Sequence, residues 1–296
     1  MRVVLIAGPT ASGKSSAAIS VAQRQDGVII NADSMQVYRE LDILTSRPSR
    51  ADEQLVEHRL YGYIPARERC SVARWLEDAG REIKGLVKEG RTAVVVGGTG
   101  LYFKALEFGL APVPEISLQV KSDLKALLAE LGAAGLHELL AKLDRPAAEK
   151  LEVNDSQRVL RALEVVQSTG KPLAHFHQIA AQNSVLAGLQ VDKLALVPPR
   201  ELLYARINAR FDEMMAQGAL EEVRKLLALD LADDLPVMKA IGVRALGRFL
   251  NGEIDEDEAI RIAKQESRNY AKRQMTWLRN QMADWKSFES GDEIVF

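Results

Sequence analysis

The first fifteen residues contain the feature that most constrains the fold of this chain. An apolar run, residues 3–7, leads without a gap into Gly8-Pro9-Thr10-Ala11-Ser12-Gly13-Lys14-Ser15. This octet fits the pattern G-x-x-x-x-G-K-[ST] of a phosphate-binding loop of the nucleotide-binding type. The sequence therefore predicts a buried parallel strand, a tight loop and a helix from Ser15 to about Arg24. A glycine-rich turn that binds no ligand is the alternative interpretation.

The residue types of the loop suit phosphate chemistry. The glycines let successive backbone N–H groups face inward, and the following helix adds the positive end of its dipole. Lys14 supplies a mobile charge for the outer phosphate oxygens, and the Ser15 hydroxyl is a candidate Mg²⁺ ligand. We therefore expect the phosphate site to comprise Gly8, Thr10, Ala11, Ser12, Gly13, Lys14 and Ser15.

Further strand–helix units follow along the chain. Short β-branched runs at 27–32, 91–96 and 194–197 predict buried parallel strands, whereas residues 115 to about 180 show only helical periodicity. We predict an α/β fold: a P-loop NTPase-like, doubly wound parallel sheet with an α-helical insertion domain. The expected domains are 1–112 (first part of the core), 113–185 (helical insertion) and 186–296 (completion of the core). Further helices are expected at 51–57, 71–90, 201–217, 219–229 and 257–282.

Composition narrows the function classes. Basic and acidic residues number 39 and 41, so any nucleic-acid surface must arise from local segregation of charge. The single cysteine, Cys70, excludes an internal disulfide. No apolar run reaches membrane-spanning length, and the short apolar start is neither a signal peptide nor a span. We therefore expect a cytoplasmic protein without a membrane partner.

Asp33 and Ser34 follow the second predicted strand. In an open parallel sheet the ligand crevice lies at the carboxyl ends of the strands, so Asp33 should face the phosphate loop. Its carboxylate could bind Mg²⁺, act as a general base, or serve a structural hydrogen bond. Gln36 lies close by, and its amide could pair with an adenine edge or remain solvated.

Gly97-Gly98-Thr99 follows the third predicted strand. The glycines allow close approach of a ligand, and the Thr99 hydroxyl could orient a phosphate or simply cap the next helix. Many P-loop nucleotidases place a Mg²⁺-binding Asp at the end of a central strand. Its absence here weakens the interpretation as a generic ATPase.

Basic residues gather on two predicted helices near the C-terminus. Arg206 and Arg210 lie one turn apart, and beside the phosphate loop they would form a pyrophosphate clamp. Residues 261–286 contain seven basic side chains, Lys272 and Arg273 among them, and only two acidic ones, with aromatic residues interspersed. Such a stripe suits an RNA backbone, although a solvated amphipathic helix would also explain it.

In combination, these motifs resemble one family, the tRNA dimethylallyltransferases (tRNA isopentenyltransferases). The resemblance covers nearly the whole chain and keeps the family's order of motifs. Besides the phosphate loop, it rests on Asp33-Ser34-Met35-Gln36-Val37-Tyr38, Val96-Gly97-Gly98-Thr99-Gly100-Leu101-Tyr102, Asn154-Asp155-Ser156-Gln157-Arg158, Ala240-Ile241-Gly242-Val243-Arg244 and Tyr270-Ala271-Lys272-Arg273-Gln274-Met275-Thr276-Trp277.

The resemblance implies transfer of a dimethylallyl group from dimethylallyl diphosphate to N6 of adenosine 37 in tRNAs, with release of diphosphate. The phosphate loop would then hold the diphosphate of the donor, together with Arg210 and with Mg²⁺ on Ser15. Asp33 would face the adenine amino group as general base or hydrogen-bond acceptor, and Thr99 would help to position Asp33 and the donor. Asp33, Thr99 and Arg210 are therefore the expected catalytic residues.

The resemblance also implies which segments contact the anticodon stem-loop of tRNA. The target base must leave its stack to reach a buried donor. We expect the chain to act as a monomer. The expected tRNA-binding residues are Asp33, Ser34, Met35, Gln36, Lys121, Gln157, Arg158, Val159, Leu160, Arg161, Lys239, Gly242 and Arg244, joined by Lys272 and Arg273 of the basic stripe.

Val243 departs from the family pattern, which often has tyrosine between the glycine and the basic residue, so an aromatic contact at this position is left open. Two rival functions remain at this point. A P-loop small-molecule kinase would turn over ATP without RNA. A non-catalytic RNA-binding protein would bind tRNA without chemistry, although the intact Gly13-Lys14-Ser15 argues against it.

Overall fold

The computed structural model describes residues 2–180 and 184–294. The chain forms two compact units: Met1–Leu106 with Leu186–Phe296, and Glu107–Val185. The first boundary thus falls at 106/107 rather than at 112/113, because the sheet-bearing unit ends within a helix and the proline-containing stretch after it belongs to the second unit. Residues 1, 181–183 and 295–296, which fall in the predicted domains, lie outside the described residues.

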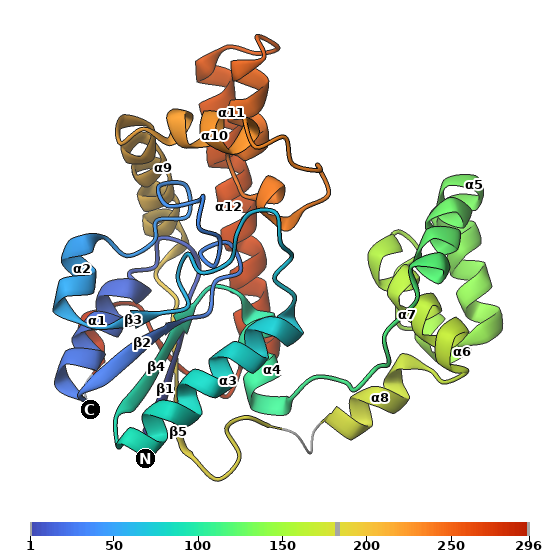
Figure 1. Cartoon of the computed structure of the whole chain (residues 1–296), viewed down its shortest axis with the longest axis horizontal. Helices are drawn as coiled ribbons and strands as arrows, with labels where there is room; N and C mark the ends of the chain where they lie inside the picture. Colours follow the sequence, from blue (N-terminus) through green and yellow to red (C-terminus); the bar gives the residue numbers. More distant parts are fainter. Residues whose placement is uncertain (1, 181–183, 295–296) are drawn as a thin grey trace. The chain divides into compact units, whose positions relative to one another are not determined.

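A parallel sheet forms the centre of the larger unit (Figure 1). Within the described ranges it has six strands in the order β3-β2-β4-β1-β5-β6, and all pairings are parallel. The strands are β1 (Arg2–Ala7), β2 (Gly27–Asn31), β3 (His58–Arg59), β4 (Thr92–Gly97), β5 (Gln190–Leu196) and β6 (Lys286–Phe288). The predicted fold class is confirmed, whereas the short edge strands β3 and β6 were not predicted.

Alternation along the strands places apolar side chains on both faces of the sheet. Val4, Ile6 and Ile29 pack with α1 in one core cluster. Their strand neighbours Leu5 and Ile30 are also fully buried and point to the opposite face, where α3 contacts β2 and β4. Both faces are therefore covered, as a doubly wound sheet requires.

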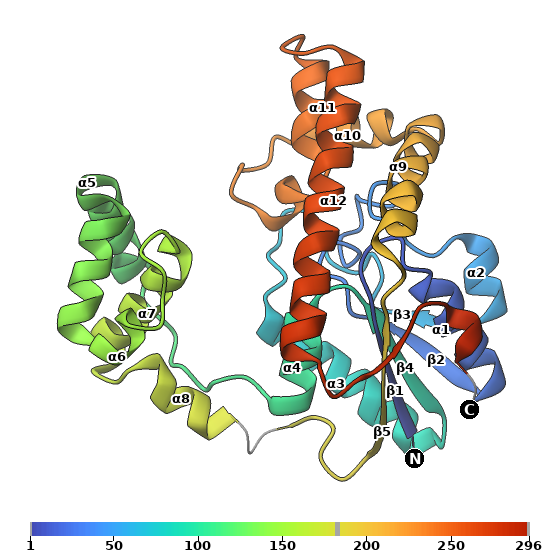
Figure 2. The ribbon, with the colours of Figure 1, turned by 180° about the vertical axis from the view of Figure 1, so that it is seen from behind.

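Two long helices of the larger unit begin at side-chain caps. Ser71 caps α3 by accepting the Arg74 N–H, and Asp255 caps α12 by accepting the Glu258 N–H. Helix α12 packs against α9 and α11 (Figure 2). The helices are α1 (Lys14–Arg24), α2 (Arg50–Leu55), α3 (Val72–Glu89), α4 (Gly100–Phe108), α9 (Arg200–Ala216), α10 (Ala219–Leu227), η1 (Pro236–Lys239), α11 (Val243–Leu250), α12 (Glu256–Gln281) and η2 (Gly291–Glu293).

The second unit is helical, as predicted, and has its own core. Leu124, Leu136 and Leu140 of α5 pack against Val159 and Leu163 of α7. Gly132 interrupts α5 with φ +68°, a conformation that glycine adopts without strain. Its helices are α5 (Leu118–Leu143), α6 (Arg145–Ala148), α7 (Ser156–Thr169) and α8 (Leu173–Ala180). Across the described part of the chain, no helix combines the length and apolar character that crossing a membrane demands.

Candidate active site

The phosphate loop connects β1 to α1 in the expected geometry. The Ser12 N–H donates to Pro9 O at 3.2 Å, which closes the turn, and Gly13 has φ +89° immediately before α1 begins. Lys14 Nζ donates to Pro9 O at 3.2 Å, so its side chain folds back over the loop. A Cβ at Gly8 would lie 2.6 Å from the buried Ser12 Oγ, and glycine is therefore required there.

Asp33 is held rigidly beyond the end of β2. Asn31, which is fully buried, accepts the Asp33 N–H at 2.8 Å and donates to Asp33 O at 3.0 Å. The carboxylate in turn accepts the Met35 N–H through Oδ1 at 2.9 Å. This Asx turn fixes one oxygen of the carboxylate and leaves Oδ2 outside the turn.

Thr99 connects the loop after β4 to the Asp33 segment. Its Oγ1 accepts the Ser34 N–H at 2.9 Å and lies 3.3 Å from Ser34 Oγ. Its own N–H donates to Ala32 O at 3.2 Å. Thr99 therefore orients the backbone on both sides of Asp33.

Helix α12 covers both loops with a residue that sequence reasoning did not single out. Gln274 is 6% exposed; its Oε1 accepts the Thr10 N–H and its Nε2 donates to Gly98 O, both at 2.9 Å. Burial raises the pKa of Tyr270, whose phenol lies beside Thr99 and Gln274. Gln274 belongs to the C-terminal motif that begins at Tyr270, but its partners Thr10 and Gly98 lie far away along the chain. The sequence alone therefore does not indicate its role.

The loop at residues 42–47 forms another wall. Glu222 of α10 accepts the backbone N–H groups of Asp42, Ile43 and Leu44 at 2.7–2.9 Å. Gln36 donates through Nε2 to Thr45 O at 2.8 Å and to Ser46 O at 3.1 Å. The amide nitrogen of the half-buried Gln36 is therefore engaged by the loop in this structure, and Gln36 supports that loop.

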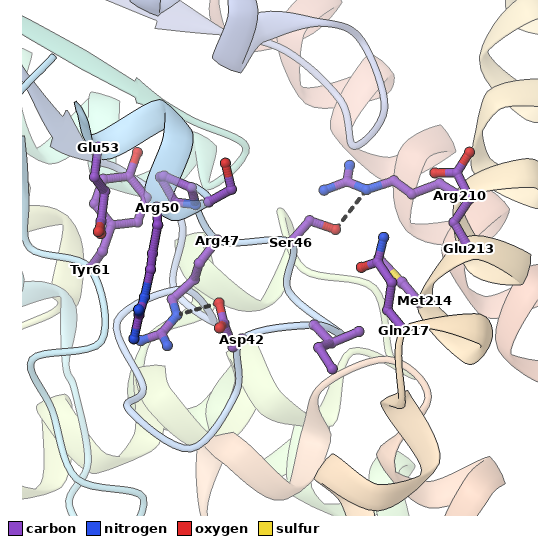
Figure 3. Close-up of a pocket in the computed structure, with 13 residues that line it drawn as sticks. Asp42, Ser46, Arg47, Arg50, Glu53, Tyr61, Arg210, Glu213, Met214 and Gln217 are labelled. Carbon is purple, nitrogen blue, oxygen red and sulfur yellow. Dashed lines mark hydrogen bonds and ion pairs between the residues drawn. The ribbon is translucent and has the colours of Figure 1, made fainter. Parts of the chain in front are cut away.

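Several cavities adjoin these segments. One of about 220 Å³ is lined by Gly8, Gly98, Thr99 and Gln274 among others, and three further cavities share Arg210. The phosphate-loop cavity, about 400 Å³, is lined by Ala11–Ser16, Tyr61, Arg210 and Glu213 among others. The Asp33 cavity, about 250 Å³, is lined by Thr10, Asp33–Met35, Arg210 and Tyr270 among others. The outer cavity, about 530 Å³, is lined by Asp42, Ser46, Arg47, Arg50, Arg210 and Glu213 among others (Figure 3).

Arg210 lines all three cavities and is therefore the point at which they meet. Figure 3 shows its guanidinium directed toward Ser46, and Nε donates to Ser46 Oγ at 2.7 Å. Burial lowers the pKa of Arg210, and the negative charges of Asp33 and Glu213 act in the opposite direction.

Lys14 shares this electrostatic environment. Burial lowers its pKa to about 8; the Asp33 carboxylate opposes this shift and the Arg210 guanidinium adds to it. The two cations and the carboxylate thus act on one another within a single site. A cationic cradle can stabilise an anionic leaving group, and a fixed carboxylate beside it can accept a proton from an attacking nucleophile.

The structure places most predicted residues of the larger unit around these cavities. Met35, Lys239 and Arg273 line the Asp33 cavity, and Arg273 lies over the Tyr270 ring at 5.6 Å. Gly242 requires glycine, since φ is +92° and a Cβ would lie 3.0 Å from Leu44 Cδ2. Arg244 and Lys272 are exposed and line none of the three cavities.

Other predictions on α9, α11 and α12 need correction. Arg206 is exposed and lines none of the three cavities, whereas Arg210 lines all of them, so Arg210 alone of the two faces the phosphate loop. Val243 is 1% exposed, so this position serves packing in the core. The basic stripe is only partly open to solvent, because Lys264 pairs with Asp212 of α9 and Arg268 donates to Asn208.

The predicted residues of the helical unit cluster at the start of α7, with Lys121 near the start of α5. Gln157, Arg158 and Arg161 are exposed. Val159 is fully buried in the helical core, so its side chain serves packing and is not available to a nucleic acid. The half-buried Leu160 packs against the same core.

Comparison with known proteins agrees with this arrangement. A family model described as "IPP transferase" matches residues 36–281, and one described as "Isopentenyl transferase" matches residues 1–67. A Rhizobium meliloti protein named tRNA dimethylallyltransferase is 46% identical, with 98% of this chain and 96% of the relative covered. A relative of the same name from Nitrobacter hamburgensis is 48% identical, with 98% and 92% covered.

Solved structures of tRNA-modifying transferases also resemble this chain. The tRNA isopentenylpyrophosphate transferase of Bacillus halodurans superimposes with a TM-score of 0.70 at 34% identity, covering 97% of this chain and 89% of that one. A eukaryotic dimethylallyltransferase described as acting on tRNA gives a TM-score of 0.82 at 26% identity, covering 96% and 71%. With this similarity along nearly its whole length, the chain belongs to the tRNA dimethylallyltransferase family.

Proposed function

We propose that this protein transfers a dimethylallyl group from dimethylallyl diphosphate to N6 of adenosine 37 in tRNA and releases diphosphate. The observation that carries the proposal is the position of Arg210, which lines both the phosphate-loop cavity and the Asp33 cavity. A donor with its diphosphate on the loop would extend toward the carboxylate that faces the acceptor. Membership of the family supports the same reaction.

The donor half of the site serves the leaving group. As the allylic C–O bond breaks, negative charge builds on the diphosphate, and the charges of Lys14 and Arg210 and the N–H groups of the loop stabilise it. These groups contribute most where that charge is greatest, in the transition state. The loop thus acts on an isoprenoid diphosphate in place of a nucleotide.

Magnesium fits this half of the site as a partner of the diphosphate. The exposed Ser15 hydroxyl lines the phosphate-loop cavity and offers one hard oxygen ligand, with phosphate oxygens and water available for the others. Among residues 2–180 and 184–294, no three His, Cys, Asp or Glu side chains form a metal-binding group, which fits a metal that arrives with its substrate. Bound there, Mg²⁺ would neutralise part of the leaving-group charge.

The acceptor half of the site serves the adenine amino group. As N6 forms its bond to the dimethylallyl carbon, the N6 proton moves to the Asp33 carboxylate and the C–O electron pair leaves with diphosphate. Asn31 and Thr99 hold Asp33 in place for this step. We propose the anticodon stem-loop as the bound part of tRNA, the exposed basic residues of α7 and α12 as its phosphate contacts, and a cytoplasmic monomer as the working form.

The kinase alternative gains no support from the structure. Strand β4 ends at Gly97, and the loop after it supplies a threonine where many P-loop nucleotidases have a metal-binding aspartate.

The test is incubation with unmodified tRNA, Mg²⁺ and radiolabelled dimethylallyl diphosphate, followed by nucleoside mass analysis. The expected product is one adenosine that carries an added dimethylallyl group. Consumption of ATP without transfer to RNA would contradict the proposal.

A further inference from the structure

Gln274 of α12 joins two loops of the candidate site in the larger unit. It is a buried amide whose oxygen accepts from Thr10 of the phosphate loop and whose nitrogen donates to Gly98 of the loop after β4. Both partners are backbone groups of segments that line the site. A buried amide is costly unless its polar atoms are paired, and here both ends are satisfied by the two loops.

The connection continues from Gly98 to the catalytic carboxylate. Gly98 immediately precedes Thr99, which accepts the Ser34 N–H and donates to Ala32 O on either side of Asp33. A path of hydrogen bonds, continued by the Gly98–Thr99 peptide link, therefore runs from the loop that would hold the donor, through Gln274, to the segment that would face the acceptor.

The surrounding shape makes this path specific. A Cβ added to Gly98 would collide with Gln274 Nε2, and one added to Gly97 would collide with the Ala32 backbone. Gly98 thus leaves the space that the amide fills, and Gly97 lets the loop approach the Ala32 backbone. On the same face of α12, the buried Ala271 and Leu278 fix the helix against its neighbours, so Gln274 projects from a rigid element.

We propose that Gln274 is a positioning residue that sets the separation between the diphosphate-binding loop and Asp33 during prenyl transfer. It touches neither substrate and acts through Thr10, Gly98 and Thr99. Transfer requires the dimethylallyl carbon to lie within reach of N6 while the carboxylate receives the proton. A displacement of about 1 Å costs roughly 10²-fold in rate. This inference rests on the function proposed above.

The decisive variant is Gln274→Glu, which preserves shape and the acceptor for Thr10. The ionised carboxylate would place an oxygen against Gly98 O, and the two would repel each other. Protonation would restore a donor toward Gly98 O, and a buried carboxyl that faces a carbonyl has a raised pKa. The groups beside this position are the Arg273 guanidinium and the Tyr270 phenol, whose pKa burial raises, so the phenol stays neutral over the range tested. We expect kcat to fall about 10²-fold at pH 8, with KM for dimethylallyl diphosphate and tRNA changed less than about threefold.

The distinguishing readout is the ratio of variant to wild-type kcat as a function of pH. For Gln274→Glu this ratio should rise as pH falls from 8 to 5.5, because protonation repairs the contact. Gln274→Leu removes both bonds and cannot be repaired, so its ratio should stay low and flat. Gly98→Ala, which displaces the amide from the other side, should reduce kcat in the same way as Gln274→Leu.

Asn280→Asp is the matched control, because it makes the same amide-to-carboxylate change on the same helix. Asn280 is exposed and lines none of the four cavities described at the site, so its ratio should stay near 1 at every pH. Thermal unfolding of each variant, followed by circular dichroism, separates loss of fold from loss of positioning.

Two results would overturn the inference: a pH-independent ratio for Gln274→Glu in a folded protein, or equal losses in kcat and in substrate affinity. Absence of transfer by the wild type would instead overturn the proposed function.

Discussion

Arg210 donates a hydrogen bond from Nε to Ser46 Oγ at 2.7 Å and thereby ties helix α9 to the loop that Glu222 holds from α10. The guanidinium is half-buried at the junction of the three cavities, where its orientation is fixed before any substrate arrives. An arginine oriented in advance loses little side-chain entropy when a diphosphate binds.

Replacing Arg210 with lysine tests this orientation. Lysine keeps the charge but loses the planar fork and the Ser46 contact, and hydrogen bonds to charged groups are worth about 1.5–3 kcal/mol. We expect kcat/KM for dimethylallyl diphosphate to fall by about 10- to 150-fold in a steady-state transfer assay. Arg206→Lys, one turn away and exposed, is the control and should stay within about twofold. Equal effects of both changes would contradict the role of Arg210.

The lowered pKa of Lys14 predicts that binding of the donor depends on pH. Its pKa is lowered to about 8 in the protein without ligand, so the ammonium becomes neutral as pH rises through 8. A bound diphosphate favours the charged form, and binding above pH 8 must therefore take up a proton. We expect the Kd for dimethylallyl diphosphate to rise above pH 8 by up to about tenfold per pH unit.

Isothermal titration calorimetry between pH 7 and 9.5 measures this effect. Burial raises the pKa of Tyr61 and of Tyr270, so both phenols stay neutral in this window. Lys14→Met should bind more weakly at pH 7 and lose the rise. A wild-type Kd that does not change with pH would show that Lys14 does not contact the diphosphate.

Asp33→Asn separates the chemical role of the carboxylate from its structural one. The amide oxygen can still accept the Met35 N–H, so the Asx turn is preserved, but the proton acceptor is lost. We expect kcat to fall about 10²- to 10⁴-fold, the usual range for loss of a general base, with tRNA affinity nearly unchanged. Single-turnover transfer and filter binding measure the two quantities. Equal losses in both would make Asp33 a binding residue only.

Lys272 tests whether the exposed part of the basic stripe contacts tRNA. A lost phosphate contact reduces the slope of log K against log salt concentration by roughly 1. We expect this reduction for Lys272→Ala in tRNA-binding titrations between about 50 and about 200 mM salt. Lys264→Ala is the control, because Lys264 is engaged with Asp212. An unchanged slope for Lys272→Ala would assign its side chain to solvent.

The features that were predictable from sequence are local ones. Strand β1, the phosphate loop and α1 follow one another within 24 residues, and their residue types specify strand, turn and helix directly. The position of Asp33 followed from the rule for strand ends in parallel sheets. The helical insertion was visible as a long stretch with only one periodicity.

The features that were missed depend on contacts between distant segments. Strand β3 has two residues, and only pairing with β2 identifies it as a strand. Val159 follows directly after exposed polar residues of the same motif, and only the packing of α5 on α7 shows that it is buried. Gln274 reads as one polar residue in a basic helix until its partners Thr10 and Gly98, 264 and 176 positions away, are brought to it.

The bond between Gln274 and Thr10 also has a consequence for biosynthesis. The phosphate-binding octet leaves the ribosome well before the side chain that fastens it, because 264 positions separate Thr10 from Gln274. The chain between them must close a long loop before this contact forms, and such contacts form late in folding. A nascent or truncated chain that ends before α12 therefore displays the motif without the finished site.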